Sequence, residues 1–281
     1  MEFSPEILYL AAILGSVGAL AGFSAGLFGI GGGAIMVPAL FFTLTFMGFP
    51  ADVTMHCAVA TSAAIIIVNA IRSVKKHHAH GAVDWELLWP KNKLQSYALW
   101  VGLGSFAAAL WLAPLLSGRD LTLIFVVIAS VLSLQLIFGK SDWTIRKTIP
   151  GGAARPLVGS SVGALSSLMG VGGGTIMVPL MVVCSVPFHR AVATSSGFGL
   201  AIAAPATLGF IISGWGAAGR PAFSLGYVNG VGFAVIACTA FLTIPLGVKL
   251  AHRLSQEKLR VVFGYCLLFV ALNMLRKSFG A

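Results

Sequence analysis

The chain has 281 residues, of which 58% are hydrophobic and only 9% carry a formal charge. A soluble domain carries about 25% charged residues, and a mean hydropathy of +0.95 leaves too few polar groups to cover a surface in water. The net charge of +10 does not indicate a nucleic-acid partner, because the basic residues lie in short loops between apolar segments, where they mark the inner side of membrane proteins and meet anionic headgroups.

Apolar segments long enough for membrane helices follow one another along the chain, since a spanning helix needs about 20 apolar residues. They lie at 7–27, 34–47, 57–71, 94–116 and 121–138, and then at 157–169, 175–188, 190–213, 226–248 and 259–275. We therefore expect one all-α integral membrane domain over residues 1–281, with about eight to ten hydrophobic helices. The N-terminus lacks the basic stretch of a cleaved signal peptide, so the first segment should remain as a membrane helix.

The chain contains one unit twice. Residues 27–38 (LFGIGGGAIMVP) recur as residues 168–179 (LMGVGGGTIMVP), with nine of twelve positions identical, and residues 56–62 (HCAVATS) recur as residues 189–195 (HRAVATS). The elements keep the same order, which predicts two homologous halves, repeat 1 at about 7–139 and repeat 2 at about 156–277. Internal duplication of this kind is typical of secondary transporters.

The distribution of basic residues favours halves of opposite orientation. If each half crosses the membrane an odd number of times, the loops at 72–93, 139–156, 188–190 and 249–258 share the inner side and hold 14 of the 18 lysines and arginines. With four crossings per half the inner side holds 12 of them. Basic loops mark the inner side, so we expect inverted repeats, with a parallel arrangement as the alternative.

Each longer motif contains three consecutive glycines, which predict a break in a membrane helix. A glycine in a helix interior costs about 1 kcal/mol, and non-helical backbone at membrane depth persists only inside protein or beside a water-filled cavity. The helices after the breaks should begin near Ala34 and Thr175, with Pro38 and Pro179 in the first turn, where a proline loses little. We expect broken or re-entrant helices at the bundle centre.

A helix that begins at such a break offers a site for an anion. Its first N–H groups have no partner within the helix and carry the positive end of the helix dipole, and glycines allow a ligand to approach this backbone closely. The alternative is that the small residues only allow close helix packing.

Hydroxyl groups and histidines of the shorter motif complete the candidate site. Threonine and serine are neutral donors that can orient an anion without trapping it, although they also bond to the helix carbonyl four residues earlier. The histidines can cap a helix, lie in the headgroup layer or titrate during transport. The candidate substrate-binding residues are Gly31, Gly32, Gly33, Thr61, Ser62, Gly172, Gly173, Gly174, Thr175, Thr194, Ser195, His56 and His189, with Pro38 and Pro179 marking the helix breaks.

Other classes of function have less support. All eight acidic residues fall in tails, loops or segment ends, whereas a cation carrier or a carboxylate proton relay usually needs an acid within the membrane. The histidine-rich tract at 77–80 is interpreted as a solvated loop, and no paired nucleophile and base or metal set lies at depth. We therefore expect neither an enzyme nor a bound metal or cofactor.

The two Gly-x-Gly-Gly-Gly-x-x-x-Val-Pro blocks at 29–38 and 170–179, the two Ala-Val-Ala-Thr-Ser blocks and residues 81–85 (GAVDW) resemble the TauE/SafE family of sulfite exporters and anion permeases. The resemblance covers nearly the whole chain. It implies a carrier of the bacterial or archaeal inner membrane for sulfur-containing anions such as sulfite or organosulfonates. Asn229 stands where the first copy has Asp84, so any role of this acid is not duplicated.

The sequence thus predicts a secondary transporter that binds a small anion at the interface of the two repeats and works by alternating access. Export is favoured over uptake only through the family resemblance, and proton coupling would involve His56 or His189. An anion channel is the alternative. The expected partners are the anion and the lipid bilayer, with no nucleic acid, and a homodimer is compatible with this arrangement.

Overall fold

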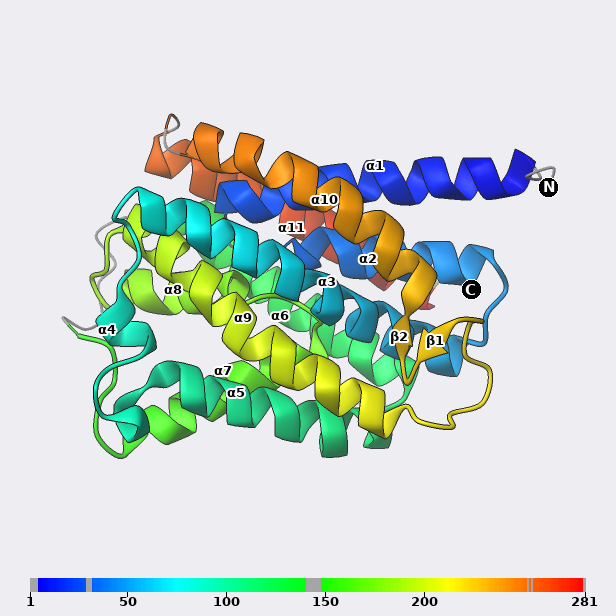
Figure 1. Ribbon diagram of the computed structural model, residues 1–281, viewed down its shortest axis with the longest axis horizontal. Helices are drawn as coiled ribbons and strands as arrows, with labels where there is room; N and C mark the ends of the chain where they lie inside the picture. The colour runs from blue at the N-terminus through cyan, green and yellow to red at the C-terminus, as the bar shows by residue number, and fades with distance from the viewer. Residues whose placement is uncertain (1–4, 29–31, 140–147, 252, 254, 280–281) are drawn as a thin grey trace.

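The computed structural model describes residues 5–28, 32–139, 148–251, 253 and 255–279, which form a bundle of helices (Figure 1). The helices of the first half are α1 (Pro5–Phe28), α2 (Gly33–Phe46), α3 (Ala51–Ala79), the short α4 (Trp85–Leu88), α5 (Tyr97–Ala107) and α6 (Gly118–Phe138). The second half contains α7 (Ala154–Leu168), α8 (Gly174–Val183), α9 (Phe188–Ser213), α10 (Gly230–Ala251) and α11 (Gln256–Phe279). The prediction of an all-α membrane protein is confirmed in its main part.

Five of the described helical segments are long and apolar enough to cross a membrane: α3, α6, α9, α10, and α5 together with its continuation to Leu115. That continuation is a π-helical turn, η2 (Ala108–Leu112), and a 3-10 turn, η3 (Ala113–Leu115); a further 3-10 turn, η1 (Lys93–Gln95), precedes α5. α2 and α8 have 14 and 10 residues, about 21 and 15 Å at 1.5 Å per residue, which is too short for a hydrocarbon core of about 30 Å.

Two segments differ from the sequence-based expectation. α3 continues through the basic and histidine-rich tract to Ala79, and His77 is buried rather than solvated in a loop; cations in the last turn of a helix are stabilised by its dipole. α10 begins only at Gly230, after an antiparallel hairpin of β1 (Ser224–Leu225) and β2 (Val228–Asn229). The expected helix cannot begin at 226, because Gly226 has a φ of +57°, outside the helical region.

The long helices pack mainly across the boundary between the halves. α1 packs against α10 and α7 against α5, while α3 packs against α9 and α6 against α11. The close pairs rest on glycine: a Cβ atom added to Gly22 would lie 2.2 Å from the Ala240 carbonyl oxygen, and one added to the corresponding Gly163 would lie 1.9 Å from that of Val101. Small residues allow membrane helices to approach at this distance, so both halves use the same device.

α3 and α9 run in opposite directions. The backbone N–H of Asp84, just after α3, bonds to Thr194 in the first turns of α9, and that of Asn229, after α9, bonds to Thr61 in the first half of α3. We call the two ends of the bundle the Asp84 end and the Asn229 end; they lie at the left, with α4, and at the right, with β1 and β2 (Figure 1).

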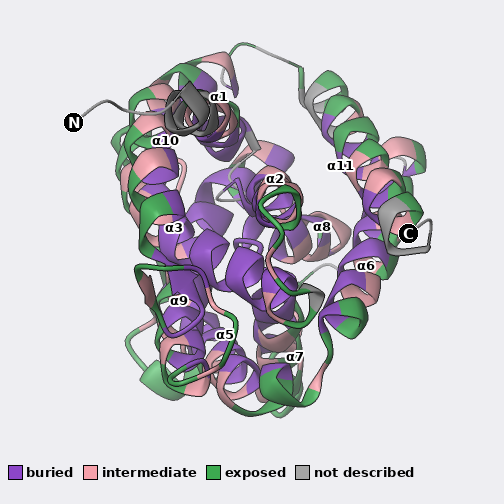
Figure 2. Ribbon diagram, turned by 90° about the vertical axis from the view of Figure 1, so that its right-hand side faces the viewer, coloured by how far each residue is buried: buried purple, intermediate pink, exposed green. Residues whose placement is uncertain are grey.

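α2 and α8 occupy the middle of the bundle, surrounded by the longer helices (Figure 2). Buried residues gather on the inward faces of the ring, while large apolar side chains such as Trp111, Leu242 and Phe269 stay exposed on its outside. An apolar exterior of this extent fits a lipid environment rather than water.

Candidate functional site

Both glycine runs interrupt the helical chain, as predicted. α1 ends at Phe28 and α2 begins at Gly33; α7 ends at Leu168 and α8 begins at Gly174. Gly31 lies outside the described residues. Gly32 precedes α2 with a φ of +80°, a conformation that suits glycine. No side chain among the described residues caps the start of α2 or of α8.

The two prolines lie deeper in their helices than expected. α2 begins at Gly33 and α8 at Gly174, so Pro38 and Pro179 are the sixth residues of these helices rather than members of the first turn. A proline there lacks the N–H that would bond to the carbonyl four residues earlier. The carbonyl groups of Ala34 and Thr175 therefore lose their usual helical partners close to each break.

The two breaks meet beside the middle of α3. A Cβ atom added to Gly33 would lie 2.5 Å from the Gly170 carbonyl oxygen and 3.1 Å from Ile66. The Ser62 hydroxyl donates a hydrogen bond of 2.7 Å to the same Gly170 carbonyl. Gly173 lies against Phe198 and Gly199 of α9, where an added Cβ would come within 2.6 Å of Phe198. Glycine is required at these contacts because two backbones touch there.

The first turns of α2 and α8 face each other across this centre. α2 leads from the centre to the start of α3 and α8 leads to the start of α9. The starts of α3 and α9 lie at opposite ends of the bundle, so the two short helices leave the centre in opposite directions. Each turns its N-terminus, the positive end of its dipole, toward the middle of the protein.

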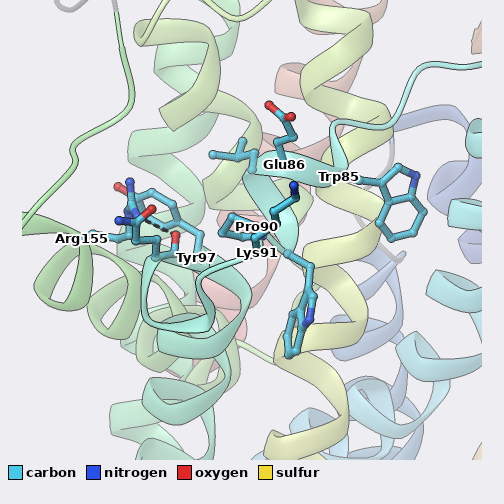
Figure 3. Close-up of a pocket in the computed structure, with 9 residues that line it drawn as sticks. Trp85, Glu86, Pro90, Lys91, Tyr97 and Arg155 are labelled. Atoms are coloured by element: carbon cyan, nitrogen blue, oxygen red, sulfur yellow. Dashed lines mark hydrogen bonds between the residues drawn. The ribbon is translucent and has the colours of Figure 1, made fainter.

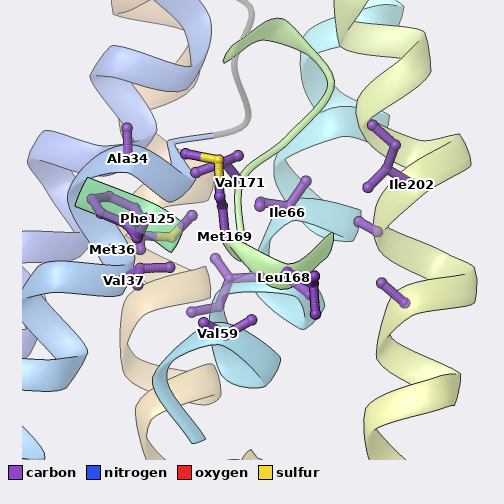
Figure 4. Close-up of a cluster of buried hydrophobic side chains, with 14 of the residues drawn as sticks. Ala34, Met36, Val37, Val59, Ile66, Phe125, Leu168, Met169, Val171 and Ile202 are labelled. Carbon is purple, nitrogen blue, oxygen red and sulfur yellow. The ribbon is translucent and has the colours of Figure 1, made fainter. Parts of the chain in front are cut away.

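In this conformation the centre is filled by apolar side chains. Met169 and Val171 of the second break lie between Met36 and Val37 of α2 on one side and Ile66 of α3 on the other, within one buried cluster (Figure 4). All five have at most 1% of their surface exposed. A ligand at the helix starts therefore requires these packed surfaces to separate.

Thr61 and Thr194 each accept a hydrogen bond from the backbone of the other half, at equivalent positions of the two repeats. The N–H of Asn229 donates to Thr61 Oγ1 at 2.8 Å, and the N–H of Asp84 donates to Thr194 Oγ1 at 3.0 Å. The side chains of Asn229 and Asp84 then each accept the N–H three residues later, at 2.8 and 3.2 Å. Both threonines are completely buried, so each connects the two halves in the interior.

These threonines lie too far apart to hold one small anion together. Gly199 lies beside Ala70, where an added Cβ would be 3.4 Å from the Ala70 Cβ. Counting along the antiparallel helices at 1.5 Å per residue puts Thr61 and Thr194 roughly 20 Å apart. The structure thus brings Gly33, Ser62 and the second break together, and it places the two threonines on opposite sides of them.

The two ends differ in charge at the same pair of positions. Arg190 Nη2 lies 3.2 Å from Asp84 Oδ2. In the other copy the corresponding residues are Cys57 and Asn229, both neutral. This pairing could have been found in the sequence, because the base Arg190 and the acid Asp84 are both replaced by neutral residues at the corresponding positions of the other copy. Asp84 and Asn229 were not among the predicted site residues.

A sequence model of the family described as "Sulfite exporter TauE/SafE" matches residues 14–274. The chain belongs to the TauE/SafE family. It is 32% identical over 264 residues to a "Probable membrane transporter protein" of Haemophilus influenzae, covering 93% of this chain and 96% of the relative. A protein of the same description from Methanocaldococcus jannaschii is 26% identical over 287 residues, covering 98% of each chain. No solved structure matches the chain.

Family membership and the apolar helices together identify this TauE/SafE protein as a multi-pass membrane transporter. Its two predicted histidines lie in different surroundings. His56 is buried; its Nδ1 faces the Asp52 carbonyl and its Nε2 the Ala113 carbonyl, both at 2.9 Å, and its ring stacks on Tyr227. His189 is partly exposed, at the Asp84 end.

The remaining predicted residues lie close to the breaks or in the adjoining turns of α9. Thr175 is buried in the first turn of α8, with a long contact of 3.4 Å from its hydroxyl to the Gly172 carbonyl. Ser195 is buried and donates to the Val192 carbonyl at 2.8 Å, a bond within its own helix but three residues back rather than the four that the sequence left as an alternative. Thr175 is therefore the predicted hydroxyl group nearest to a helix start.

A pocket of about 440 Å³ opens near α4 at the Asp84 end of this TauE/SafE protein (Figure 3). Arg155 at the start of α7 donates to the Gln95 carbonyl at 2.6 Å, and the Tyr97 hydroxyl donates to Pro150. Glu86 and Lys91 also line the pocket, so charges of both signs surround it. It joins the starts of α5 and α7 and offers no convergent set of anion donors.

Proposed function

We propose that this protein is a secondary transporter that exports small sulfur-containing anions, such as sulfite or organosulfonates, across the cell inner membrane. The observation that carries the proposal is the meeting of the two helix breaks beside Ile66, with the N-termini of α2 and α8 directed at each other. Uncapped helix starts attract anions, and the glycines allow close approach. Gly32, Gly33, Gly173, Gly174 and Thr175 would line the bound anion.

Inverted repeats are part of this proposal. They are supported by the opposite directions of α3 and α9, and by the exchange of equivalent hydrogen bonds between Thr61 and Asn229 and between Thr194 and Asp84. The end of α3, the start of α9 and the loops around α4 lie together and are rich in lysine and arginine. Basic loops favour the cytoplasmic side, so we assign the Asp84 end to the cytoplasm.

Alternating access follows from this arrangement. The side chains at the centre are packed together, and each end is held by one threonine bond between the halves. Rocking of one half against the other would break the bond at one end while the other stays closed. The carried anion would then reach the helix starts from the open side. Sulfite or a sulfonate as the substrate, and export as the direction, are supported by the description of the family.

Radiolabelled sulfite flux in proteoliposomes tests the function. A secondary transporter should show saturable flux that accelerates when unlabelled sulfite is present on the opposite side. Flux that rises linearly with concentration and is insensitive to the opposite side would indicate a channel instead. No sulfite or sulfonate flux above that of empty liposomes would contradict the proposal.

A pair of threonine variants tests the site. Thr175→Val removes the hydroxyl at the start of α8 and keeps the volume, and we expect weaker substrate binding, about tenfold for one lost hydrogen bond. The control is Thr207→Val in α9, because the Thr207 hydroxyl is also buried and donates to the Ala203 carbonyl of its own helix. Equal affinity in both variants and the wild type would exclude Thr175 from the site.

A further inference from the structure

A second cationic cavity lies between α3 and α10, away from the helix breaks. It has a volume of about 400 Å³ and is lined by Ile71, Arg72, Lys75, Lys76 and Phe241. Arg72, Lys75 and Lys76 are three and four residues apart, so they share one face of α3. Three of the five lining residues are therefore positively charged.

These charges have no counter-ion in the part of the protein that the structure describes. The ion pair found there joins Arg190 to Asp84 and does not involve this cavity. The Arg72 guanidinium lies 3.6 Å from the centroid of the Phe241 ring, and its Nε is buried with no hydrogen-bond partner among the described residues. The Arg72 Nε and the two exposed lysines are therefore available to bind an anion.

The cavity lies at the depth of the headgroups on the side proposed as cytoplasmic. α3 and α10 run side by side in the same direction, because Gly232 adjoins Thr61 and Phe241 adjoins Arg72. Arg72 is seven residues before the end of α3 at Ala79, about 10 Å along the helix. Ile71 and Phe241 are 40% and 42% exposed, which suits apolar side chains next to a lipid.

The three cations of the cavity occur in one repeat only. Positions 205, 208 and 209 of α9 correspond to 72, 75 and 76 of α3 in the repeat, and they hold Pro205, Leu208 and Gly209. The cations therefore serve a purpose that the duplicated centre does not need. If these cations belonged to a transport site formed by both halves, we would expect them in both repeats.

We infer that Arg72, Lys75, Lys76 and Phe241 form a binding site for an oxyanion group, distinct from the central site. Arg72 offers a planar pair of N–H donors that matches two oxygens of a phosphate or sulfonate, and the lysines add point charges. Two sources share this chemistry: the phosphate of an anionic lipid headgroup and a free sulfonate in the cytoplasm. The inference does not depend on which anion the protein transports.

Binding to purified, delipidated protein in a neutral detergent tests the site. The probes are phosphatidylglycerol in mixed micelles, phosphatidylcholine as the neutral lipid, and methanesulfonate, each followed by native mass spectrometry and thermal shift. We expect Arg72→Gln combined with Lys75→Gln and Lys76→Gln to weaken binding of the anionic probe about 100-fold, since each basic group near an anionic surface contributes about a factor of five. Phe241→Leu should weaken it several-fold.

The matched control removes the same charges elsewhere on the same side: Lys93→Gln, Lys249→Gln and Arg253→Gln, all exposed. Loss of phosphatidylglycerol binding in the cavity variant alone supports the site with a lipid as its ligand, and the same loss for methanesulfonate supports a free anion. Equal binding of both anionic probes by wild type, control and cavity variants overturns the inference. Arg72→Gln alone, which removes one partly buried charge, decides the question if the triple variant fails to fold.

Discussion

Arg190 of the second half and Asp84 of the first half lie 3.2 Å apart at one end of the bundle. At the other end the repeat places Cys57 and Asn229 in the corresponding positions. One end is thus closed by a hydrogen bond and an ion pair, and the other by a hydrogen bond alone. A duplicated transporter with identical ends would have no built-in preference for one side, so this difference biases which end opens.

The effect of the ion pair on opening can be tested by replacing Asp84 with asparagine, the residue at the corresponding position of the other end. Asp84→Asn keeps the side chain that caps α4 and removes the charge, so the Asp84 end should open more often. The pair is partly exposed, with 57% and 29% of the two side chains accessible, and such a pair contributes about 0.2–1 kcal/mol. We expect a two- to fivefold rise in the labelling rate of Cys184, which is buried near the Asp84 end.

Native cysteines make this measurement internally controlled. Cys238 and Cys266 are exposed and are replaced by serine, which leaves Cys57 as the reporter of the Asn229 end and Cys184 as that of the Asp84 end. A water-soluble maleimide should react faster with Cys184 in Asp84→Asn, while Cys57 keeps its rate. Equal acceleration of both cysteines would indicate general loosening and contradict a role for the pair at one end.

The two threonine bonds should control opposite ends. Thr61→Val leaves the buried N–H of Asn229 without its acceptor, and Thr194→Val does the same to the partly buried N–H of Asp84. An unsatisfied buried group costs about 1–3 kcal/mol. Thr61→Val should therefore speed labelling of Cys57, and Thr194→Val that of Cys184, each about tenfold or more. If either variant accelerates both cysteines alike, the threonines do not act as separate closures.

The duplication, the helix breaks and most helix boundaries could be predicted from the sequence because each has a local cause. Three consecutive glycines cannot sustain a membrane helix, and the apolar segments have the lengths that helices require. The extent of α3 could not be predicted in this way. Lys75, Lys76 and His77 are polar enough for a loop, yet packing buries His77 and the helix continues to Ala79.

The candidate site was harder to predict, because it depends on contacts between distant residues. The motif Ala-Val-Ala-Thr-Ser suggests that Thr61 and Ser62 act together. In the structure the Thr61 hydroxyl accepts the N–H of Asn229, whereas the Ser62 hydroxyl donates to the carbonyl of Gly170. Two adjacent hydroxyls point to different partners on a helix, and only the packing of the halves decides which partners these are.

His56 joins α3 to the start of the η3 segment, and its removal should destabilise the protein. His56→Phe keeps an aromatic ring on Tyr227 but loses the contacts to the carbonyls of Asp52 and Ala113, both at 2.9 Å. We expect a loss of about 1–3 kcal/mol, seen as a lower melting temperature in detergent. Tyr227→Phe keeps the stacked ring and both carbonyl contacts of His56 and is the control; a melting temperature that falls equally in both variants would contradict the role of these contacts.

The orientation of the halves can be decided by labelling from each side of the membrane. Lys76 at the end of α3 and Lys258 at the start of α11 belong to different repeats. With inverted halves both lie at the Asp84 end, so Lys76→Cys and Lys258→Cys should be labelled from the same side in right-side-out vesicles. Arg119→Cys, at the start of α6, should be labelled from the opposite side. Arg119 serves as the control for the opposite side, because α6 crosses the bundle once between Arg119 and Phe138.

Labelling of Lys76→Cys and Lys258→Cys from opposite sides would require parallel halves. The starts of α2 and α8 could then not face each other across the centre.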